Sequence, residues 1–201
     1  YGDTWQPADN IIMRMPAIAA IYVPLDGMNE CGLCVADLIE INGEAVHQNT
    51  GKTPITTVAA IRLMLDYAAN VDEAIALLQQ YDMHSSMNVA HHFALCDTTG
   101  KYAVVEYVDN QLVVTESIAC TNHRLTCNTQ PTDTGLQPAI SNSHQRLEQL
   151  LAAPNSKSLL NSMQDVAFDG WTRWSIVFNP NQKQATYYFN ADFSTPYTIE
   201  L

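Results

Sequence analysis

Two cysteines separated by two residues, Cys31 and Cys34, are the first side chains in this chain whose spacing could support chemistry. A Cys-x-x-Cys pair serves either as a redox dithiol or as half of a zinc site. The redox motif normally opens a helix, whereas the residues after Cys31 alternate as in a strand. The chain lacks a second zinc half-site, because six residues rather than two lie between Cys120 and Cys127. We therefore interpret both cysteines as structural residues and expect no metal.

The adjacent histidines His91 and His92 are a second candidate for metal binding. They stand at the start of a run that alternates as a strand does, and neighbouring strand residues point to opposite faces of a sheet. One ion is therefore not easily reached by both, and we expect them to be surface or core histidines. The chain has no G-x-S-x-G motif, no glycine-rich phosphate loop and no H-E-x-x-H motif, and we expect no cofactor.

A third group of polar residues, TNHRL at 121–125, directly follows an apolar run. Polar groups at such a place cost free energy unless they are exposed or used. The side-chain amide of Asn122 could donate to a developing oxyanion. By spacing alone, a strand end that meets a polar loop is the better interpretation of this group. Arg146 lies on a predicted helix opposite a leucine face, where an arginine is usually solvated or ion-paired.

Segregated helix and strand patterns must position these residues. Helical periodicity over 56–69 and from about 71 to 81 predicts two helices, the first capped by Thr56 or Thr57 and the second opened by an Asn70–Glu73 capping box. Two further short helices are predicted at 143–152 and 158–167. Period-two runs predict strands at 32–41, 91–97, 102–108, 111–117, 118–123, 173–179, 184–190 and 197–201, with loops at 44–54 and 128–142. This order indicates an α+β domain of sheets packed against helices.

Length and composition allow one domain over 1–201 with a sizeable core, since 47% of the residues are hydrophobic. The net charge of −12 makes nucleic acid and anionic membranes unsuitable partners, and no apolar run reaches the length of a membrane span. Five cysteines, an odd number, do not fit a disulfide framework. They favour a reducing compartment such as the bacterial cytoplasm. The oligomeric state stays open, with a homo-oligomer as one alternative.

Four segments along the chain form a recognisable set: PLDGMNECGLCVADL, HHFALCDTTGKYAVVEYV, ACTNH and WSIVFNPNQKQATYYFN. In this order they resemble the P-x-DGMNE-x-GL segment, the central hairpin, the T-N segment and the late hairpin of the linear amide C–N hydrolases. This group includes choloylglycine hydrolases, penicillin V acylases and relatives of acyl-CoA:6-aminopenicillanic acid acyltransferase. The helix pair TTVAAIRLMLDYAANVDEAIALLQQYDM is similar but less specific. The resemblance covers nearly the whole chain in the same order.

This resemblance implies an αββα four-layer sandwich of the N-terminal-nucleophile type and hydrolysis of a linear, non-peptide amide in a small N-acyl substrate through a Cys acyl-enzyme. It makes Asn122 the oxyanion donor and Arg146, in S-x-x-R with Ser143, the late arginine, with Arg124 as a weaker match. The position of a second Asn found in some members is occupied by Ile39, so that only a backbone N–H could act there. Acyl transfer to an amine and a non-catalytic binding module are the alternative functions.

The front of the chain departs from the family pattern. In the family, the nucleophilic Cys and an early Arg and Asp lie well upstream of DGMNE, but none of the residues before Asp26 is a cysteine. We therefore expect this chain to correspond to the C-terminal portion of a family member. Its partner would be an N-terminal fragment or chain of the same protein that carries the nucleophile.

Overall fold

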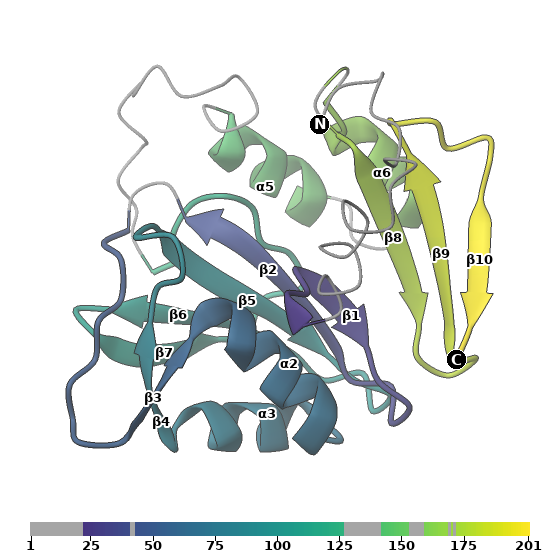
Figure 1. Ribbon diagram of the computed structural model, residues 1–201. Coiled ribbons are helices and arrows are strands. Elements are labelled where there is room, and N and C mark those ends of the chain that lie inside the picture. Colours follow the sequence, from purple (N-terminus) through teal and green to yellow (C-terminus); the bar gives the residue numbers. More distant parts are fainter. Residues whose placement is uncertain (1–21, 41–42, 127–141, 153–158, 169, 171) are drawn as a thin grey trace, which may run out of the picture.

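The computed structural model describes residues 22–40, 43–126, 142–152, 159–168, 170 and 172–201 (Figure 1). Three sheets organise them. The largest has five antiparallel strands in the order β1-β2-β5-β6-β7: β1 (Asp26–Met28), β2 (Cys34–Glu40), β5 (Ala90–Cys96), β6 (Tyr102–Val108) and β7 (Gln111–Thr115). A three-stranded antiparallel sheet contains β8 (Trp174–Asn179), β9 (Gln184–Phe189) and β10 (Tyr197–Glu200). A parallel pair joins β3 (Thr53–Thr56) to β4 (Tyr81–His84).

Helices α2 (Thr57–Tyr67) and α3 (Val71–Leu78) cover one face of the five-stranded sheet (Figure 1). Their buried side chains interdigitate with every second residue of the strands, as the alternation of a strand requires. The core that results contains Val35, Phe93 and Val105 from the sheet and Ile61, Met64 and Leu78 from the helices. Removal of this apolar surface from water is the main stabilising contribution to the fold.

The opposite face of the five-stranded sheet turns toward α5 (Ser143–Ala152), α6 (Leu159–Val166) and strand β8. An apolar cavity of about 560 Å³ lies between them. Its walls include Leu38 and Val104 from the sheet, Leu150 and Met163 from the two helices and Phe178 from β8. The described residues therefore have the mixed α and β structure that the sequence predicts.

The local signals for helix starts are confirmed by the structure. Thr56 is the N-cap of α2, and its hydroxyl accepts a hydrogen bond from the Ala59 N–H. Asn70 caps α3 by accepting from the Glu73 N–H at 3.0 Å, and the Glu73 carboxylate accepts from the Ala69 N–H at 2.8 Å. These bonds satisfy N–H groups that have no partner within the helix.

Two boundaries differ from the sequence prediction. The helix predicted to reach 81 ends at Leu78, and the residues after it form β4. The polar stretch 44–54, predicted as a loop, contains the start of β3. Both errors have one cause, because β3 and β4 are short strands that pair with each other across a long stretch of sequence.

The strand predicted at 118–123 does not form, and these residues run as an irregular segment. Residues 1–21 and most of the loop predicted at 128–142 lie outside the described residues.

Candidate functional site

Asn122 and Arg146, the two residues predicted to act in catalysis, are in direct contact. An Nη2 N–H of Arg146 donates to Oδ1 of Asn122 at 2.9 Å, and Nδ2 of Asn122 donates to the backbone carbonyl of Ile39 at 3.0 Å. A residue after β7, a residue of α5 and the end of β2 therefore meet at one point. An amide NH₂ group has two N–H donors, so Asn122 can bind Ile39 and a second acceptor together.

The guanidinium of Arg146 is itself held in place. Its Nε donates to Oδ1 of Asn142 at 3.0 Å, and the Arg146 Cζ atom lies 5.5 Å from the centre of the Phe168 ring. The side chain is half-buried, and this burial lowers the pKa of Arg146 from its usual high value. An arginine nevertheless stays charged in proteins, so it polarises the Asn122 carbonyl and fixes which end of the amide is the donor.

The residues on either side of Asn122 are clamped to the start of α5. Ser143 Oγ lies 2.9 Å from His123 Nδ1 and 2.9 Å from Thr121 Oγ1, and Thr121 Oγ1 donates to the Ser143 carbonyl at 2.8 Å. All three residues are buried. Burial, reinforced by the charges of His144 and His92, lowers the pKa of His123 to about 4, so the ring is neutral at pH 7. The clamp fixes Asn122 with respect to α5, one turn before Arg146.

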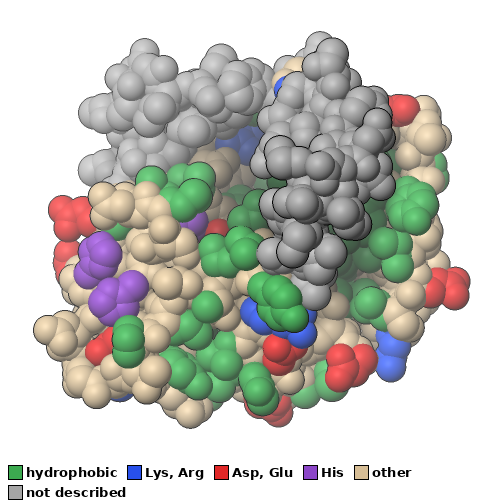
Figure 2. Space-filling model, in the orientation of Figure 1, with side chains coloured by type: hydrophobic (Ala, Val, Ile, Leu, Met, Phe, Trp, Pro, Cys, Tyr) green, Lys and Arg blue, Asp and Glu red, His purple; other side chains and the backbone are tan. Residues whose placement is uncertain are grey.

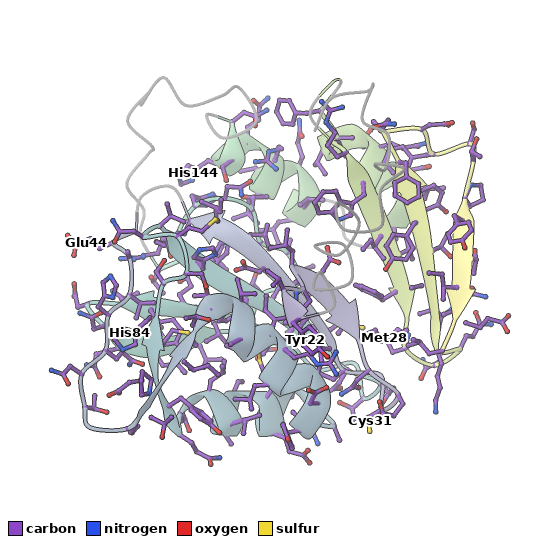
Figure 3. All side chains as sticks on the ribbon, in the orientation of Figure 1. Tyr22, Met28, Cys31, Glu44, His84 and His144 are labelled. Atoms are coloured by element: carbon purple, nitrogen blue, oxygen red, sulfur yellow. The ribbon has the colours of Figure 1, made fainter. Side chains whose placement is uncertain are left out.

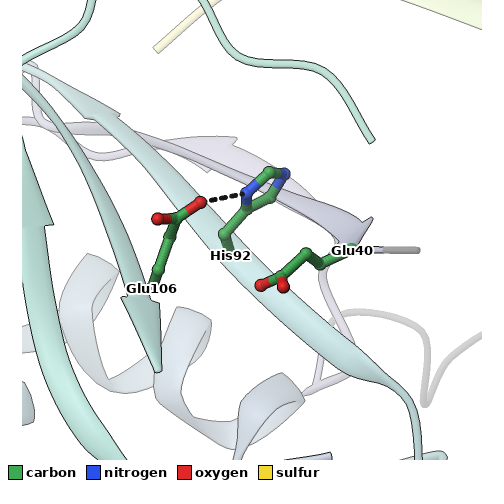
Figure 4. Close-up of side chains that lie close together, drawn as sticks. All are labelled: Glu40, His92 and Glu106. Atoms are coloured by element: carbon green, nitrogen blue, oxygen red, sulfur yellow. Dashed lines mark hydrogen bonds and ion pairs between the residues drawn. The ribbon is translucent and has the colours of Figure 1, made fainter. Parts of the chain in front are cut away.

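A buried cluster of Glu40, His92 and Glu106 (Figure 4) contacts the same segment. His92 Nδ1 is 3.3 Å from Glu106 Oε1, and Arg124 Nε is 2.6 Å from Glu40 Oε1. The Glu106 carboxylate also accepts from the backbone N–H of Leu125 at 2.6 Å. Burial opposes ionisation of Glu106, but the bonds from His92 and from the backbone outweigh it and lower its pKa. Burial raises the pKa of Glu40, although the Arg124 charge opposes this shift.

Glu40, His92 and Glu106 are the one group of three potential metal ligands among the described residues. A ligand atom of each lies within 4.8 Å of the other two. The cation beside Glu40 is Arg124, however, and Glu106 is occupied by backbone donors and His92. We therefore assign this cluster to anchoring the 121–126 segment. Arg124, the weaker match to the late arginine, serves this anchor rather than the Asn122 amide.

The adjacent histidines point to opposite faces of β5, as predicted. His91 Nδ1 is 2.9 Å from Asp37 Oδ2 on β2, whereas His92 faces Glu106 on β6. A different histidine pair, His47 and His84 at the end of β4, was not singled out by sequence analysis. Figure 2 shows two histidine side chains close together on the molecular surface. His47 Nδ1 and His84 Nδ1 are 3.4 Å apart there. These residues are far apart in the sequence, so sequence analysis could not find the pair. In the structure an isolated bridge between their backbones brings them together.

The Cys-x-x-Cys cysteines occupy different environments. Cys31 is exposed in the loop after β1. Figure 3 shows it well away from two other potential metal ligands, Glu44 and His144 on α5. Cys34 is buried at the first residue of β2. The motif thus enters a strand and not a helix, as its sequence context predicts. Asn29 lies between Gly27 and the start of β2, and it organises the turn there. Its Oδ1 accepts from the Cys31 and Leu33 N–H groups at 3.1 and 3.0 Å.

Comparison with known proteins identifies the family. Residues 21–192 match the model of the acyl-coenzyme A:6-aminopenicillanic acid acyltransferase family. The chain belongs to this family. Its match covers the DGMNE turn, both helix pairs and the Asn122–Arg146 contact. No curated protein sequence matches the chain.

Solved structures confirm the fold of this family member. A mutant of conjugated bile acid hydrolase from Clostridium perfringens superimposes with a TM-score of 0.64 at 17% identity, covering 88% of this chain and 72% of that one. Penicillin V acylase from Agrobacterium tumefaciens gives a TM-score of 0.59 at 22% identity, covering 89% of this chain and 65% of that one. The fold is therefore that of the N-terminal-nucleophile hydrolases. In the described part of the chain, no helix combines the length and apolar character needed to cross a bilayer.

Proposed function

We propose that this chain carries the oxyanion site of an enzyme that cleaves a linear, non-peptide amide bond in a small N-acyl substrate. The observation that supports it is the contact between the Asn122 amide and the Arg146 guanidinium. The cavity is lined by Leu38, Cys120 and Leu150, which lie close in sequence to Ile39, Asn122 and Arg146. An apolar acyl group in the cavity would thus present its carbonyl oxygen to Asn122.

In this reaction a thiolate attacks the amide carbonyl and the amine leaves, which gives an acyl-enzyme that water then hydrolyses. The second N–H of Asn122 would stabilise the negative charge that develops on the carbonyl oxygen. Arg146 would hold Asn122 in the donor orientation and strengthen its N–H by polarising the amide. The Asn122 N–H donor and the Arg146 side chain that holds it would both be fixed before the substrate binds. Such preorganisation is what makes an oxyanion site effective.

We propose that the nucleophile is a cysteine on a segment upstream of Tyr1, which would complete a four-layer αββα sandwich. The described cysteine closest in sequence to Asn122 is poorly suited to this role. Cys120 lines the cavity two residues before Asn122, but burial raises the pKa of its thiol to about 12. N-terminal sequencing and intact mass of the native protein would test this proposal. A mature chain or partner beginning with Cys supports it, and a lone native chain beginning at Tyr1 supports a non-catalytic binding module.

The catalytic role of Asn122 is tested by substitution in the complete protein. Loss of one oxyanion donor lowers kcat by about 100- to 1000-fold, and we expect this for Asn122→Ala with an N-acyl amide substrate. Gln149→Ala is the matched control, because Gln149 lies on the exposed side of the same helix as Arg146. Unchanged amide hydrolysis by Asn122→Ala would show that the oxyanion role is wrong.

Acyl transfer to an amine is the second candidate, and the matching family model favours it. Both reactions share the acyl-enzyme and differ in whether water or an amine attacks it. Product analysis in the presence of a competing amine distinguishes them: a new N-acyl product indicates transfer, and free acid alone indicates hydrolysis.

A further inference from the structure

Two cysteines far apart in the sequence lie directly opposite each other in the five-stranded sheet. Cys34 is the first residue of β2 and Cys96 is the last residue of β5, and their Cα atoms are register partners in this antiparallel pair. Directly opposed side chains point to the same face, with Cβ atoms about 4.5–5.5 Å apart. A disulfide needs about 3.5–4.5 Å between Cβ atoms, so a small movement at the strand ends would suffice.

The two thiols differ in access and in acidity. Cys96 is exposed, whereas Cys34 is 4% exposed. The Cys34 thiol interacts with the Cys96 sulfur, and this interaction lowers the pKa of Cys96 against the opposing effects of burial and of Asp97. The same interaction, with burial, raises the pKa of Cys34. The accessible thiol is therefore the one that ionises more readily, and the thiolate is the nucleophile in disulfide exchange.

We propose that Cys34 and Cys96 form a redox modification site, in which a low-molecular-weight disulfide such as oxidised glutathione converts the two thiols into a cross-strand disulfide. The Cys96 thiolate attacks one sulfur of the oxidant, which releases a glutathione thiolate and leaves a mixed disulfide on Cys96. Cys34 then loses its proton and attacks the Cys96 sulfur, which releases the second glutathione. The protein loses two electrons and two protons, and the oxidant is reduced to two thiols.

The position of the bond gives it a consequence for the fold. Both cysteines line the apolar cavity between the five-stranded sheet, the helices α5 and α6 and strand β8. Oxidation would join β2 to β5 at the cavity wall and remove both thiols from it. The strand geometry requires the Cβ atoms to move together, so the bond would carry strain. Strained disulfides are readily reduced, as labile or regulatory bonds are.

Cys31 is the natural competitor, since it is exposed and precedes Cys34 by three residues. It lies before β2, in the turn organised by Asn29, and has no register partner in the sheet. The geometry therefore selects Cys96 over Cys31 as the partner of Cys34.

Peptide mapping of the full chain tests the proposal. The reduced protein is incubated with oxidised glutathione, alkylated without reduction and digested with trypsin, which cuts between Cys34 and Cys96 at Lys52 and Arg62. Cys31 and Cys34 share one tryptic peptide, so fragmentation of the linked peptides identifies which of them is bonded to Cys96. We expect a peptide that links Cys34 to Cys96 and that disappears after treatment with dithiothreitol. The Cys31→Ser variant should form the same link. A link from Cys31 to either cysteine as the main product, or no link at all, would overturn the proposal.

The order of attack is tested separately with two further variants. Cys34→Ser should accumulate a glutathione adduct on Cys96, because the resolving thiol is missing. Cys96→Ser should acquire glutathione on Cys34 at least about tenfold more slowly, because a buried thiol of raised pKa is a poor nucleophile. Equal rates would contradict the assignment of Cys96 as the attacking residue. Circular dichroism of each variant ensures that the comparison is made on folded protein.

Discussion

Asn29 should contribute more to stability than any other side chain of the DGMNE turn. It is 8% exposed, and its amide connects the turn to helix α2. Nδ2 donates to the carbonyls of Leu65 and Ala68 at 3.0 and 2.7 Å, where α2 ends and its carbonyls lack helical partners. Oδ1 accepts from two N–H groups of the turn. One side chain thus satisfies four backbone groups.

The magnitude follows from these four bonds. A typical hydrogen bond contributes about 1 kcal/mol, and a buried polar group left without a partner costs about 1–3 kcal/mol. Water can reach part of the turn in the Asn29→Ala variant and recover some of this loss. We therefore expect Asn29→Ala to lower the free energy of unfolding by about 3–4 kcal/mol.

Urea denaturation followed by circular dichroism measures this change. Asn49→Ala is the matched control, since Asn49 is exposed, and it should change the free energy of unfolding by less than about 0.5 kcal/mol. A loss below about 1 kcal/mol for Asn29→Ala would show that the turn and the helix end do not depend on this side chain. The DGMNE motif would then need another explanation than its role in joining β1 to α2.

Two further predictions concern the helix cap and the clamp. Asn70→Ala should cost about 1 kcal/mol in the same denaturation assay, because it removes the N-cap of α3, and Asn70→Asp should retain most of the stability. His123 has its pKa lowered to about 4 in the folded chain, against about 6.5 when unfolded. The unfolded state therefore binds the proton more readily, and the stability that neutral His123 contributes is present above pH 6.5 and is lost as the pH falls toward 4. His123→Gln should flatten the pH dependence of unfolding within this window. An equally steep loss in the variant would assign the pH dependence to other groups.

Local signals predicted the helices and most strands well. The caps at Thr56 and Asn70 are written in a few adjacent residues, and both α-helix starts follow from them. The alternation of β5 and β6 and the Asp109-Asn110 turn likewise depend on neighbours in sequence. In that turn both residues have positive φ, which asparagine and aspartate tolerate better than most residues. The parallel pair of β3 and β4 could not be predicted in this way, because each strand pairs with a partner that is distant in the sequence.

The candidate site illustrates the same limit. The resemblance to a family pointed to Asn122 and Arg146, but neither spacing nor composition predicts that their side chains meet. The clamp through Ser143 and the anchor through Glu106 also connect residues that are distant in sequence. Their only sequence signal is the presence of polar residues in otherwise apolar runs.

The error at residues 118–123 explains how the site is built. A strand directs its N–H and C=O groups sideways to neighbouring strands, and its side chains alternate between two faces. The polar groups of residues 122–125 instead reach three elements in different directions. Asn122 binds the end of β2, His123 binds the start of α5, and the Leu125 N–H binds Glu106 on β6. No straight strand could make these contacts together. The density of polar residues that marked TNHRL as a candidate site is therefore also the reason why the segment is irregular.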